Sequence, residues 1–465
     1  MSTNTPTSAA NALSDLKLEG RKDKEDAAKK EGSAETEGDV TKSEQNLIQN
    51  DYEVQVKLAD LQADPNSPLY SAKSFEELGL SDELLKGLYA MKFAKPSKIQ
   101  ERALPLLLHN PPKNLIGQSQ SGTGKTAAFA LTMLSRVIPS IPTCQALCLE
   151  PSRELARQTM EVIRKMSKYT NITSQVVVPG STEKGANVVA QVVVATPGSL
   201  LEAIRRKQLD VSKLQVFVLD EADNMLDQTG MGSQCVRVKK AVPSTTQLVL
   251  FSATFPDEVY KYAQTFVPNA NEIRLQTVEL NVDAIKQFYM DCDDEMAKLT
   301  ALKNLYGLLT VSSSMIFTRT KKTADWLYKQ LTADGHTVSV LHSDLTSEER
   351  DRLIDDFREF KTRVLITTNV LARGIDIPTV SMVVNYDLPV DKDGKADPAA
   401  YLHRIGRTGR FGRTGVSISF VHDQESYKVL NDITSYYGEG IKMTHLDIKD
   451  GDWEKVEKIL KKAMK

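Results

Sequence analysis

One eight-residue segment has the composition of a loop that cradles phosphate groups. It lies between a short apolar run, Asn114 to Gly117, and a helical pattern. Its last three residues, Gly124-Lys125-Thr126, fit the phosphate-loop template, whereas Ser119 stands where that template begins with glycine. Glycines let backbone N–H groups wrap phosphate oxygens, and a helix N-terminus adds its dipole. Lys125 would supply a point charge for the outer phosphates and Thr126 a hydroxyl for magnesium. The whole segment reads Ser119-Gln120-Ser121-Gly122-Thr123-Gly124-Lys125-Thr126.

A second element supports this interpretation. The apolar run Val216 to Leu219 has the pattern of a buried strand and ends directly in Asp220-Glu221. In phosphate-loop enzymes the carboxyl end of such a strand holds the aspartate that orients magnesium. An adjacent glutamate can polarise the attacking water as a general base. The alternative is a solvated acidic turn, which the phosphate loop upstream makes improbable. We therefore expect a site that binds a nucleoside triphosphate with magnesium and hydrolyses it.

A third element is rich in arginine. Arg404, Arg407, Arg410 and Arg413 fall within ten residues and are separated by glycines. Facing a bound nucleotide, such side chains would serve as arginine fingers, which stabilise charge on the transferring phosphoryl group. The alternatives are a basic loop that binds a phosphate backbone, or a solvated loop. The regular glycines favour a packed and positioned loop.

The charge balance restricts how the protein binds nucleic acid. The chain has 465 residues, of which 59 are Lys or Arg and 61 are Asp or Glu, for a net charge of −2. This balance argues against a histone-like packager, a basic coat protein and a polybasic membrane binder. No apolar run of transmembrane length and no secretory signal are visible. The cysteines Cys144, Cys148, Cys235 and Cys292 do not form a zinc-binding pattern. We expect buried thiols at Cys144 and Cys148 and a reducing compartment.

The chain divides into a polar tail and two α/β domains. Residues 1–50 carry ten acidic and seven basic residues and no aromatic residue, which is typical of a disordered tail. The spacing of apolar residues from Tyr52 to Leu61 predicts a short amphipathic helix, either a cap on the first domain or a mobile helix that docks into a functional cleft. The boundaries that we expect are 1–50 for the tail, 51–73 for the flanking helix and linker, 74–272 for the first domain, 273–284 for a linker, and 285–465 for the second domain.

Short apolar runs alternate with helical patterns in both domains. Such runs are typical of parallel strands that are buried on both faces, with helices on each side of the sheet. The ligands of open α/β sheets bind outside the carboxyl ends of the strands, so the cleft between two such domains is the expected site. The predicted strands are Asn114–Gly117, Ala146–Leu149, Val176–Val178, Val192–Ala195, Val216–Leu219 and Leu248–Phe251, then Lys286–Met290, Met315–Phe317, Val338–Leu341, Val364–Ile366, Met382–Val384 and Val416–Val421.

Together these motifs resemble those of the DEAD-box RNA helicases, and the likeness covers about residues 70–440. Asp220-Glu221-Ala222-Asp223 matches the signature that names the family. The resemblance implies two RecA-like domains, ATP and Mg²⁺ as cofactors, and RNA as the partner. The other matching motifs are Phe75, Lys95-Pro96-Ser97-Lys98-Ile99-Gln100, Pro151 to Gln158, Thr196-Pro197-Gly198, Ser252-Ala253-Thr254, Thr367 to Asp376, and His403 to Arg410.

The resemblance also implies a role for individual residues. Phe75, Lys95 and Gln100 would bind adenine. Gly374 and Asp376 would lie at the ribose. Catalysis would use Lys125, Thr126, Asp220, Glu221 and the fingers Arg407 and Arg410. The ATP and RNA sites would be coupled by Asp223, Ser252, Thr254 and His403, and the RNA backbone would lie along Arg153, Thr196, Gly198, Thr318, Arg350 and Thr368. Two departures from the family pattern are Ser199, where arginine is usual, and Ser347, where glutamine is usual.

Finer likeness points to one branch of the family. Ala63 to Tyr70, Ser343-Asp344 and the loop Asp391 to Pro398 are similar to the DEAD-box helicases that export messenger RNA at nuclear pores. This resemblance implies control by a nucleoporin and by an activator that binds inositol hexakisphosphate. It also implies a location at the cytoplasmic face of the pore, in both cytoplasm and nucleus, and a link to translation termination. We expect a monomer without membrane insertion.

The residues fit three functions to different degrees. The leading one is an ATP-dependent RNA helicase that remodels messenger ribonucleoproteins. An ATP-gated RNA clamp with slow turnover, serving as an assembly platform, is the alternative, although the chain retains every hydrolytic group. A nucleotide kinase or GTPase leaves the second domain and its arginine loop unexplained.

The charge balance generates a first prediction. Without the tail, 52 basic residues stand against 51 acidic ones, so RNA affinity must come from a few aligned residues. We predict weak binding of single-stranded RNA without nucleotide and tighter binding when ATP closes the cleft. Fluorescence anisotropy at physiological salt measures both states, and tight binding that needs no nucleotide would contradict the prediction.

Overall fold

The computed structural model describes most of the chain from residue 54 onward. The described ranges are 54–58, 71–118, 123–181, 186–227, 230–275, 284–309, 313–369, 380–409, 414–438, 441–448 and 451–464. The predicted tail, 1–50, lies outside them. Within these ranges, no helix is both long enough and apolar enough to cross a bilayer.

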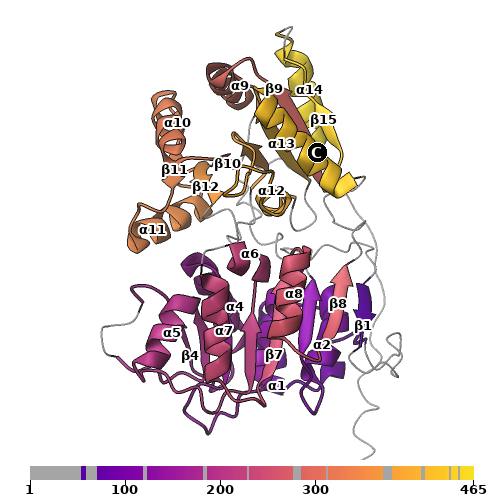
Figure 1. Ribbon diagram of the computed structural model, residues 1–465, viewed down its shortest axis with the longest axis vertical. Helices are drawn as coiled ribbons and strands as arrows, with labels where there is room; N and C mark the ends of the chain where they lie inside the picture. The colour runs from indigo at the N-terminus through magenta and orange to yellow at the C-terminus, as the bar shows by residue number, and fades with distance from the viewer. Residues whose placement is uncertain are drawn as a thin grey trace, which may run out of the picture. The chain divides into compact units, whose positions relative to one another are not determined.

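The first domain is built on an eight-stranded sheet (Figure 1). The strand order is β1-β8-β2-β7-β6-β3-β5-β4, and all the pairs are parallel except β1 with β8. The strands are β1 (Val54–Lys57), β2 (Leu115–Gln118), β3 (Ala146–Leu149), β4 (Ser174–Val177), β5 (Val192–Ala195), β6 (Val216–Leu219), β7 (Gln247–Ser252) and β8 (Asn271–Leu275). The helices are η2 (Glu76–Leu78, a 3₁₀ turn), α1 (Asp82–Ala90), α2 (Lys98–Leu108), α3 (Lys125–Ser135), α4 (Arg153–Met166), α5 (Pro197–Arg205), α6 (Ala222–Asp227), α7 (Met231–Ala241) and α8 (Asp257–Phe266).

Alternate residues of each central strand enter two different cores, one on each face of this sheet. Val216 and Val218 of β6 pack with Phe129 of α3. Phe217 and Leu219 of the same strand pack in the core of the opposite face, which includes residues of α5, α7 and α8. Burial on both faces explains why the strands read as continuous apolar runs.

The second domain repeats this architecture with a seven-stranded, all-parallel sheet of order β11-β12-β10-β13-β14-β9-β15. Its strands are β9 (Ile285–Asp291), β10 (Ser314–Thr318), β11 (Val338–Leu341), β12 (Val364–Thr368), β13 (Met382–Asn385), β14 (Gly415–Val421) and β15 (Met443–His445). Its helices are α9 (Glu295–Leu308), α10 (Lys321–Ala333), α11 (Ser347–Arg358), α12 (Pro398–Ile405), α13 (Gln424–Tyr437) and α14 (Trp453–Ala463). The predicted fold, two mostly parallel sheets with helices on both faces, is confirmed, and all twelve predicted strands are present.

Two expectations near the domain edges were wrong. The predicted helix from Tyr52 to Leu61 is, over its described part, the strand β1, which pairs antiparallel with β8. The expected linker from 273 begins too early, because β8 extends to Leu275 and pairs with both β1 and β2. Both errors arise because pairing with a distant strand outweighs the local apolar spacing. The short strand β15 was not predicted at all.

The predicted thiols of the first domain are confirmed as buried. Cys144 is 1% exposed and Cys148 is fully buried. Burial raises the pKa of the Cys144 thiol to about 12, which makes it unreactive.

The position of β1 at the sheet edge generates a stability prediction. Leu58, which follows β1, is 6% exposed and packs in the α3 face core, where Val56 also makes contact. A chain that begins at Ser71 loses these contacts and the pairing with β8. We expect the first domain to lose roughly 2–4 kcal/mol of stability, from about 1.5–3 kcal/mol per buried aliphatic side chain. Thermal unfolding of the two chains measures this, and equal melting temperatures would contradict the packing role of β1.

Candidate functional site

The carboxyl ends of β2, β3, β6 and β7 bring together the chemical groups predicted from the sequence. The loop after β2 leads into α3, which begins at Lys125, and Gly124 caps this helix with a φ of 98°. Of the predicted phosphate loop, Ser119, Gln120, Ser121 and Gly122 lie outside the described residues. A positive φ favours glycine, and a Cβ at Gly124 would lie 2.5 Å from the Gln100 side-chain amide. Both conditions explain the glycine at this position.

Gln100 and its neighbour Ser97 hold the backbone of the phosphate loop through hydrogen bonds. The Gln100 side chain is fully buried, and its Nε2 donates a hydrogen bond to the Gly124 carbonyl at 2.9 Å. Its Oε1 accepts from the Ser97 N–H at 2.9 Å, while Ser97 Oγ donates to the Thr123 carbonyl at 2.8 Å. Ser97 and Gln100 also form the capping box that starts α2. The start of α2 therefore fixes the backbone of the phosphate loop, a function that the resemblance had not suggested.

The other predicted adenine-binding residues differ in exposure. Phe75 is 1% exposed and belongs to the core on the α3 face, with its ring perpendicular to that of Phe93 at a centroid distance of 6.5 Å. Lys95 is exposed. Gly374 and Asp376, predicted near the ribose, lie outside the described residues. Adenine binding by this group remains a prediction.

A buried cluster of three charges lies at the ends of α3 and β6. Lys125 Nζ is 2.7 Å from Glu221 Oε1 and 3.1 Å from Asp220 Oδ1, and all three side chains are almost completely buried. Asp220 Oδ1 also accepts from the Glu221 N–H at 2.9 Å. Glu221 has a φ of 51°, so the chain turns sharply after the strand and places both carboxylates beside Lys125.

Burial and charge act in opposite directions in this cluster. Burial raises the pKa of Asp220 to about 6, although the Lys125 charge opposes the shift. Burial would also raise the pKa of Glu221, but the charge of Lys125, followed by that of His403, holds it below its usual value. The pKa of Lys125 is raised because the two carboxylates outweigh its desolvation. Glu221 is therefore ionised at neutral pH and is held by Lys125.

The four predicted coupling residues form one hydrogen-bonded network around Asp223. Asp223 Oδ2 accepts from Thr254 Oγ1 at 2.8 Å and from the Thr254 N–H at 3.1 Å. His403 Nε2, on α12 of the second domain, lies 3.1 Å from the same oxygen. Ser252 Oγ accepts from the Asp223 N–H at 3.1 Å and donates to the Thr254 carbonyl at 2.8 Å. His403 Nδ1 also lies 3.7 Å from Glu221 Oε2, so this network reaches the carboxylate predicted as the general base.

The arginine loop contains an anchor as well as a predicted finger. Arg404 is 1% exposed; its guanidinium bonds to Asn369 Oδ1, to Asn385 Oδ1 at 3.1 Å and to the Asp387 carbonyl at 2.6 Å. Arg407 is 2% exposed, and its Nε donates to the His403 carbonyl at 2.9 Å. Arg410 lies outside the described residues. The segment is packed as expected, but His403 and Arg404 belong to helix α12 and not to a loop, and Arg407 follows that helix. Arg404 holds the end of α12 on the second sheet.

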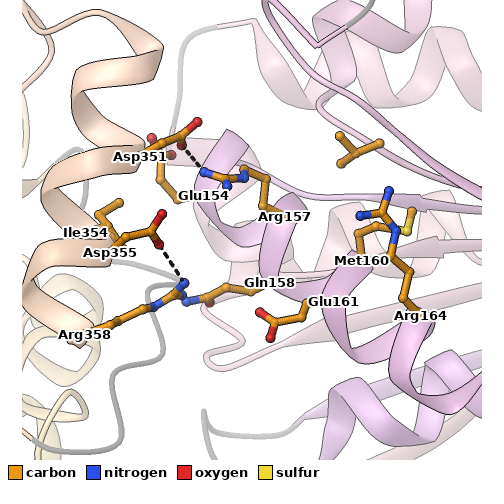
Figure 2. A pocket seen from close by; sticks show the side chains of 11 residues that line it. Glu154, Arg157, Gln158, Met160, Glu161, Arg164, Asp351, Ile354, Asp355 and Arg358 are labelled. Atoms are coloured by element: carbon orange, nitrogen blue, oxygen red, sulfur yellow. Dashed lines mark ion pairs between the residues drawn. The ribbon is translucent and has the colours of Figure 1, made fainter. Parts of the chain in front are cut away.

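Two predicted RNA-contact arginines are engaged in ion pairs with carboxylates of the opposite domain. Arg153 Nη2 on α4 lies 2.6 Å from Asp351 Oδ2 on α11. Arg350 Nη1 on α11 lies 3.4 Å from Glu154 Oε1 on α4. Figure 2 shows Arg157 pointing toward the same Asp351, at 2.5 Å. The adjoining pocket, of about 320 Å³, is lined by charged side chains of both helices. Asp351 and Arg157 were not predicted, since no sequence pattern connects charges so far apart in the chain.

The remaining predicted RNA contacts lie at strand and helix ends. Thr318 and Thr368 are register partners at the carboxyl ends of β10 and β12. Thr196 precedes α5 and donates from Oγ1 to Ser199 Oγ at 3.2 Å, so Ser199 contacts this motif although the usual arginine is absent. Gly198 lies in the first turn of α5, where a Cβ would be 3.4 Å from Gln234 Oε1. Their contacts with RNA remain predictions.

Comparison with known proteins identifies both domains. Residues 97–262 match the family model of the DEAD/DEAH box helicases, and residues 297–412 match that of the helicase conserved C-terminal domain. The chain is 67% identical to the ATP-dependent RNA helicase DBP5 of Debaryomyces hansenii over 432 residues, 92% of this chain and 87% of that protein. It is 66% identical to DBP5 of Saccharomyces cerevisiae over 420 residues, 90% of this chain and 86% of that protein.

Solved structures agree with these matches. The structure of S. cerevisiae Dbp5 bound to RNA and ADP BeF3 has a TM-score of 0.81 and 65% identity, covering 85% of this chain and all of that one. A Dbp5 variant bound to Nup159, a Gle1 variant, IP6 and ADP has a TM-score of 0.61 and 62% identity, covering 83% of this chain and 99% of that one.

The ion pairs between α4 and α11 generate a third prediction. The Asp351 carboxylate is paired with the guanidinium of Arg153, so an RNA phosphate that binds Arg153 would have to displace this carboxylate. Replacement by asparagine, Asp351→Asn, removes this competition, and we expect single-stranded RNA to bind two- to tenfold more tightly without nucleotide. The matched control is Asp355→Asn, which lines the same pocket but pairs with Arg358 of its own helix at 3.7 Å. Equal affinities for both variants and the wild type would show that Asp351 does not compete with RNA.

Proposed function

Because the chain belongs to the DEAD-box family of ATP-dependent RNA helicases, which hydrolyse ATP, we propose that it couples hydrolysis to RNA strand separation or to displacement of proteins from RNA. The observation that carries this proposal is the Asp223 carboxylate, which bonds to Thr254 of the first domain and to His403 of the second. One buried group thus connects the hydrolytic edge of the first sheet to a helix of the second domain. Closure of the cleft and assembly of the catalytic site then occur together.

The residues at the edge of the sheet fit magnesium as well as nucleotide. The Lys125 ammonium already lies against the carboxylates of Asp220 and Glu221, so this place accommodates a cation. Asp220, with the Thr126 hydroxyl, would hold the magnesium ion, partly through water. When bound, magnesium neutralises charge on the outer phosphates. Phosphate binding requires Lys125 to exchange its carboxylate partners for phosphate oxygens, which releases Glu221.

Hydrolysis then uses groups from both domains. Glu221 is ionised and, once released by Lys125, accepts the proton of the attacking water. Arg407 follows the end of α12, the helix that carries His403, and would stabilise negative charge on the γ-phosphate, with Arg410 as a second finger. His403 contacts both Asp223 and Glu221, so it would position the second domain against the base.

RNA would bind along its phosphates, with little sequence preference. Arg153, Thr196 and Gly198 would contact it from the first domain, and Thr318, Arg350 and Thr368 from the second. Arg153 and Arg350 pair with acidic groups in the structure. The binding free energy of RNA would therefore be only the difference between an arginine–phosphate contact and the arginine–carboxylate contact that it replaces. This supports weak RNA binding in the absence of nucleotide.

We further infer a role in messenger RNA export. The two relatives reported above are named DBP5, and solved structures contain Dbp5 bound to Nup159, to Gle1 with IP6, and to RNA. We propose corresponding partners for this chain, namely a nucleoporin and an activator that binds inositol hexakisphosphate. The site of action would be the cytoplasmic face of the nuclear pore. Purified partners that fail to bind the chain or to stimulate its ATPase would contradict this role but leave the helicase activity untouched.

The hydrolytic assignment generates a fourth prediction. Glu221→Gln removes the base, and we expect RNA-stimulated ATP turnover to fall about 10²- to 10⁴-fold, with ATP still bound. Arg407→Ala should likewise lose turnover while retaining ATP binding. Multiple-turnover kinetics with saturating RNA and a fluorescent ATP analogue measure the two properties separately.

The control for both variants is Glu202→Gln, which changes a solvent-accessible carboxylate on α5 that pairs with the neighbouring Arg205 and Arg206. A Glu221→Gln protein that hydrolyses ATP as fast as the wild type would overturn the assignment of the base. Slow turnover of the wild type with saturating RNA would instead favour the ATP-gated clamp.

A further inference from the structure

One buried carboxyl group beside the hydrolytic site has no role in the account above. Glu150 follows β3 directly and is fully buried. Its Oε1 accepts a hydrogen bond from Thr159 Oγ1 of α4 at 2.7 Å and is 3.5 Å from Cys148 Sγ. Its Oε2 is also buried and has no hydrogen-bond partner among the described residues. A buried carboxylate oxygen without a donor is costly, which calls for an explanation.

Glu150 lies next to Asp220 across two paired strands. Leu149 of β3 is the register partner of Leu219 of β6, and the Asp220 N–H donates to the Leu149 carbonyl at 3.1 Å. The residues that follow, Glu150 and Asp220, are therefore neighbours on adjacent strands, whose usual spacing is about 4.8 Å.

Their side chains also point to the same face of the sheet. Cys148 and Val218, two residues earlier on each strand, both pack in the core on the α3 and α4 face. Glu150 bonds to Thr159 of α4, and Asp220 pairs with Lys125 of α3, so each side chain meets a helix of that face. After burial itself, the negative charge of Asp220 is the largest influence that raises the pKa of Glu150.

The balance of charge around this place favours a divalent cation. Glu150, Asp220 and Glu221 contribute three carboxyl groups, of which Lys125 pairs with the last two and His403 lies 3.7 Å from Glu221. When a nucleotide binds, Lys125 turns to the phosphates, and the excess of acidic groups grows. Magnesium retains several of its water molecules in proteins, and these waters donate hydrogen bonds to nearby carboxylates.

We propose that Glu150 is a positioning residue of the magnesium site, whose Oε2 accepts a hydrogen bond from a water molecule of the ion held by Asp220. This inference rests on the proposed assignment of magnesium to Asp220. Thr159 fixes one carboxylate oxygen, and the other is left to orient the hydrated ion. Glu150 thus acts through water and contacts neither the phosphates nor the attacking water.

The test is the magnesium dependence of nucleotide binding by the full-length protein. Fluorescent ADP is titrated in EDTA and in saturating Mg²⁺, and the ratio of the two dissociation constants measures how strongly metal and nucleotide support each other. Glu150→Gln keeps the size of the side chain and an acceptor for Thr159 but replaces the second carboxyl oxygen with an amide nitrogen, which cannot accept a hydrogen bond. We expect the ratio to fall about tenfold, as for other groups that orient metal-bound water, with affinity in EDTA within twofold of wild type. An unchanged ratio would overturn the proposal.

Two further variants separate the possible causes. Glu272→Gln is the matched control: this buried carboxylate of β8 accepts from Tyr260 at 3.0 Å, and the variant should keep the wild-type ratio. An equal fall of the ratio in this control would overturn the proposal, because the loss of any buried carboxyl group would then have the same effect. Asp220→Asn tests the underlying assignment, because an unchanged ratio there would refute magnesium binding at Asp220 itself. If Asp220→Asn lowers the ratio and Glu150→Gln does not, only the present inference fails.

A second substitution at the same position serves as a control for a folding defect. Should Glu150→Gln not fold, Glu150→Ala removes the carboxyl group without burying a new polar one. The same tenfold fall is expected, and a wild-type ratio would again overturn the proposal.

Discussion

A single ammonium group shared between two buried carboxylates is the interaction on which the site depends. Lys125 lies within 3.1 Å of both Asp220 and Glu221. Removing three such charges from water is costly unless they compensate one another. The parallel sheet makes the compensation possible, because it delivers the ends of β2 and β6 to the same edge. In the proposed function, phosphate oxygens would take over Lys125 and magnesium the carboxylates, so each charge of the cluster would keep a partner when the nucleotide binds.

The same principle extends to the second domain. Asp223, a buried carboxylate, accepts hydrogen bonds from Thr254 and lies against His403, and Arg404 is held by two asparagines and a backbone carbonyl. Arg153 is compensated by Asp351. At each of these places the protein satisfies a charge internally, and in the proposed function RNA or ATP would have to offer a better partner. Such exchange keeps ligand binding reversible, as a cycling enzyme requires.

The parts of the fold and of the site that could be predicted from the sequence are those whose signal lies within a short segment of the chain. Strands buried on both faces are visible as apolar runs, and a phosphate loop or an Asp-Glu pair is a short motif with a specific chemistry. β1 was predicted as a helix because its apolar spacing is ambiguous over a few residues, and its pairing with β8 decided the outcome. The support of the phosphate loop by Gln100 and the pairing of Arg153 with Asp351 join segments that are distant in sequence, so neither was predictable. Glu150 was overlooked because a single acidic residue after a strand carries no pattern.

We propose that the Asp223–His403 contact carries the coupling between RNA binding and ATP hydrolysis. A double-mutant cycle with Asp223→Ala and His403→Ala tests it most directly, with the stimulation of ATPase by RNA as the measured quantity. If the two residues act through their mutual contact, the double variant loses no more stimulation than the more impaired single variant. If the losses multiply, the two residues act independently, and the account of coupling through this contact is contradicted.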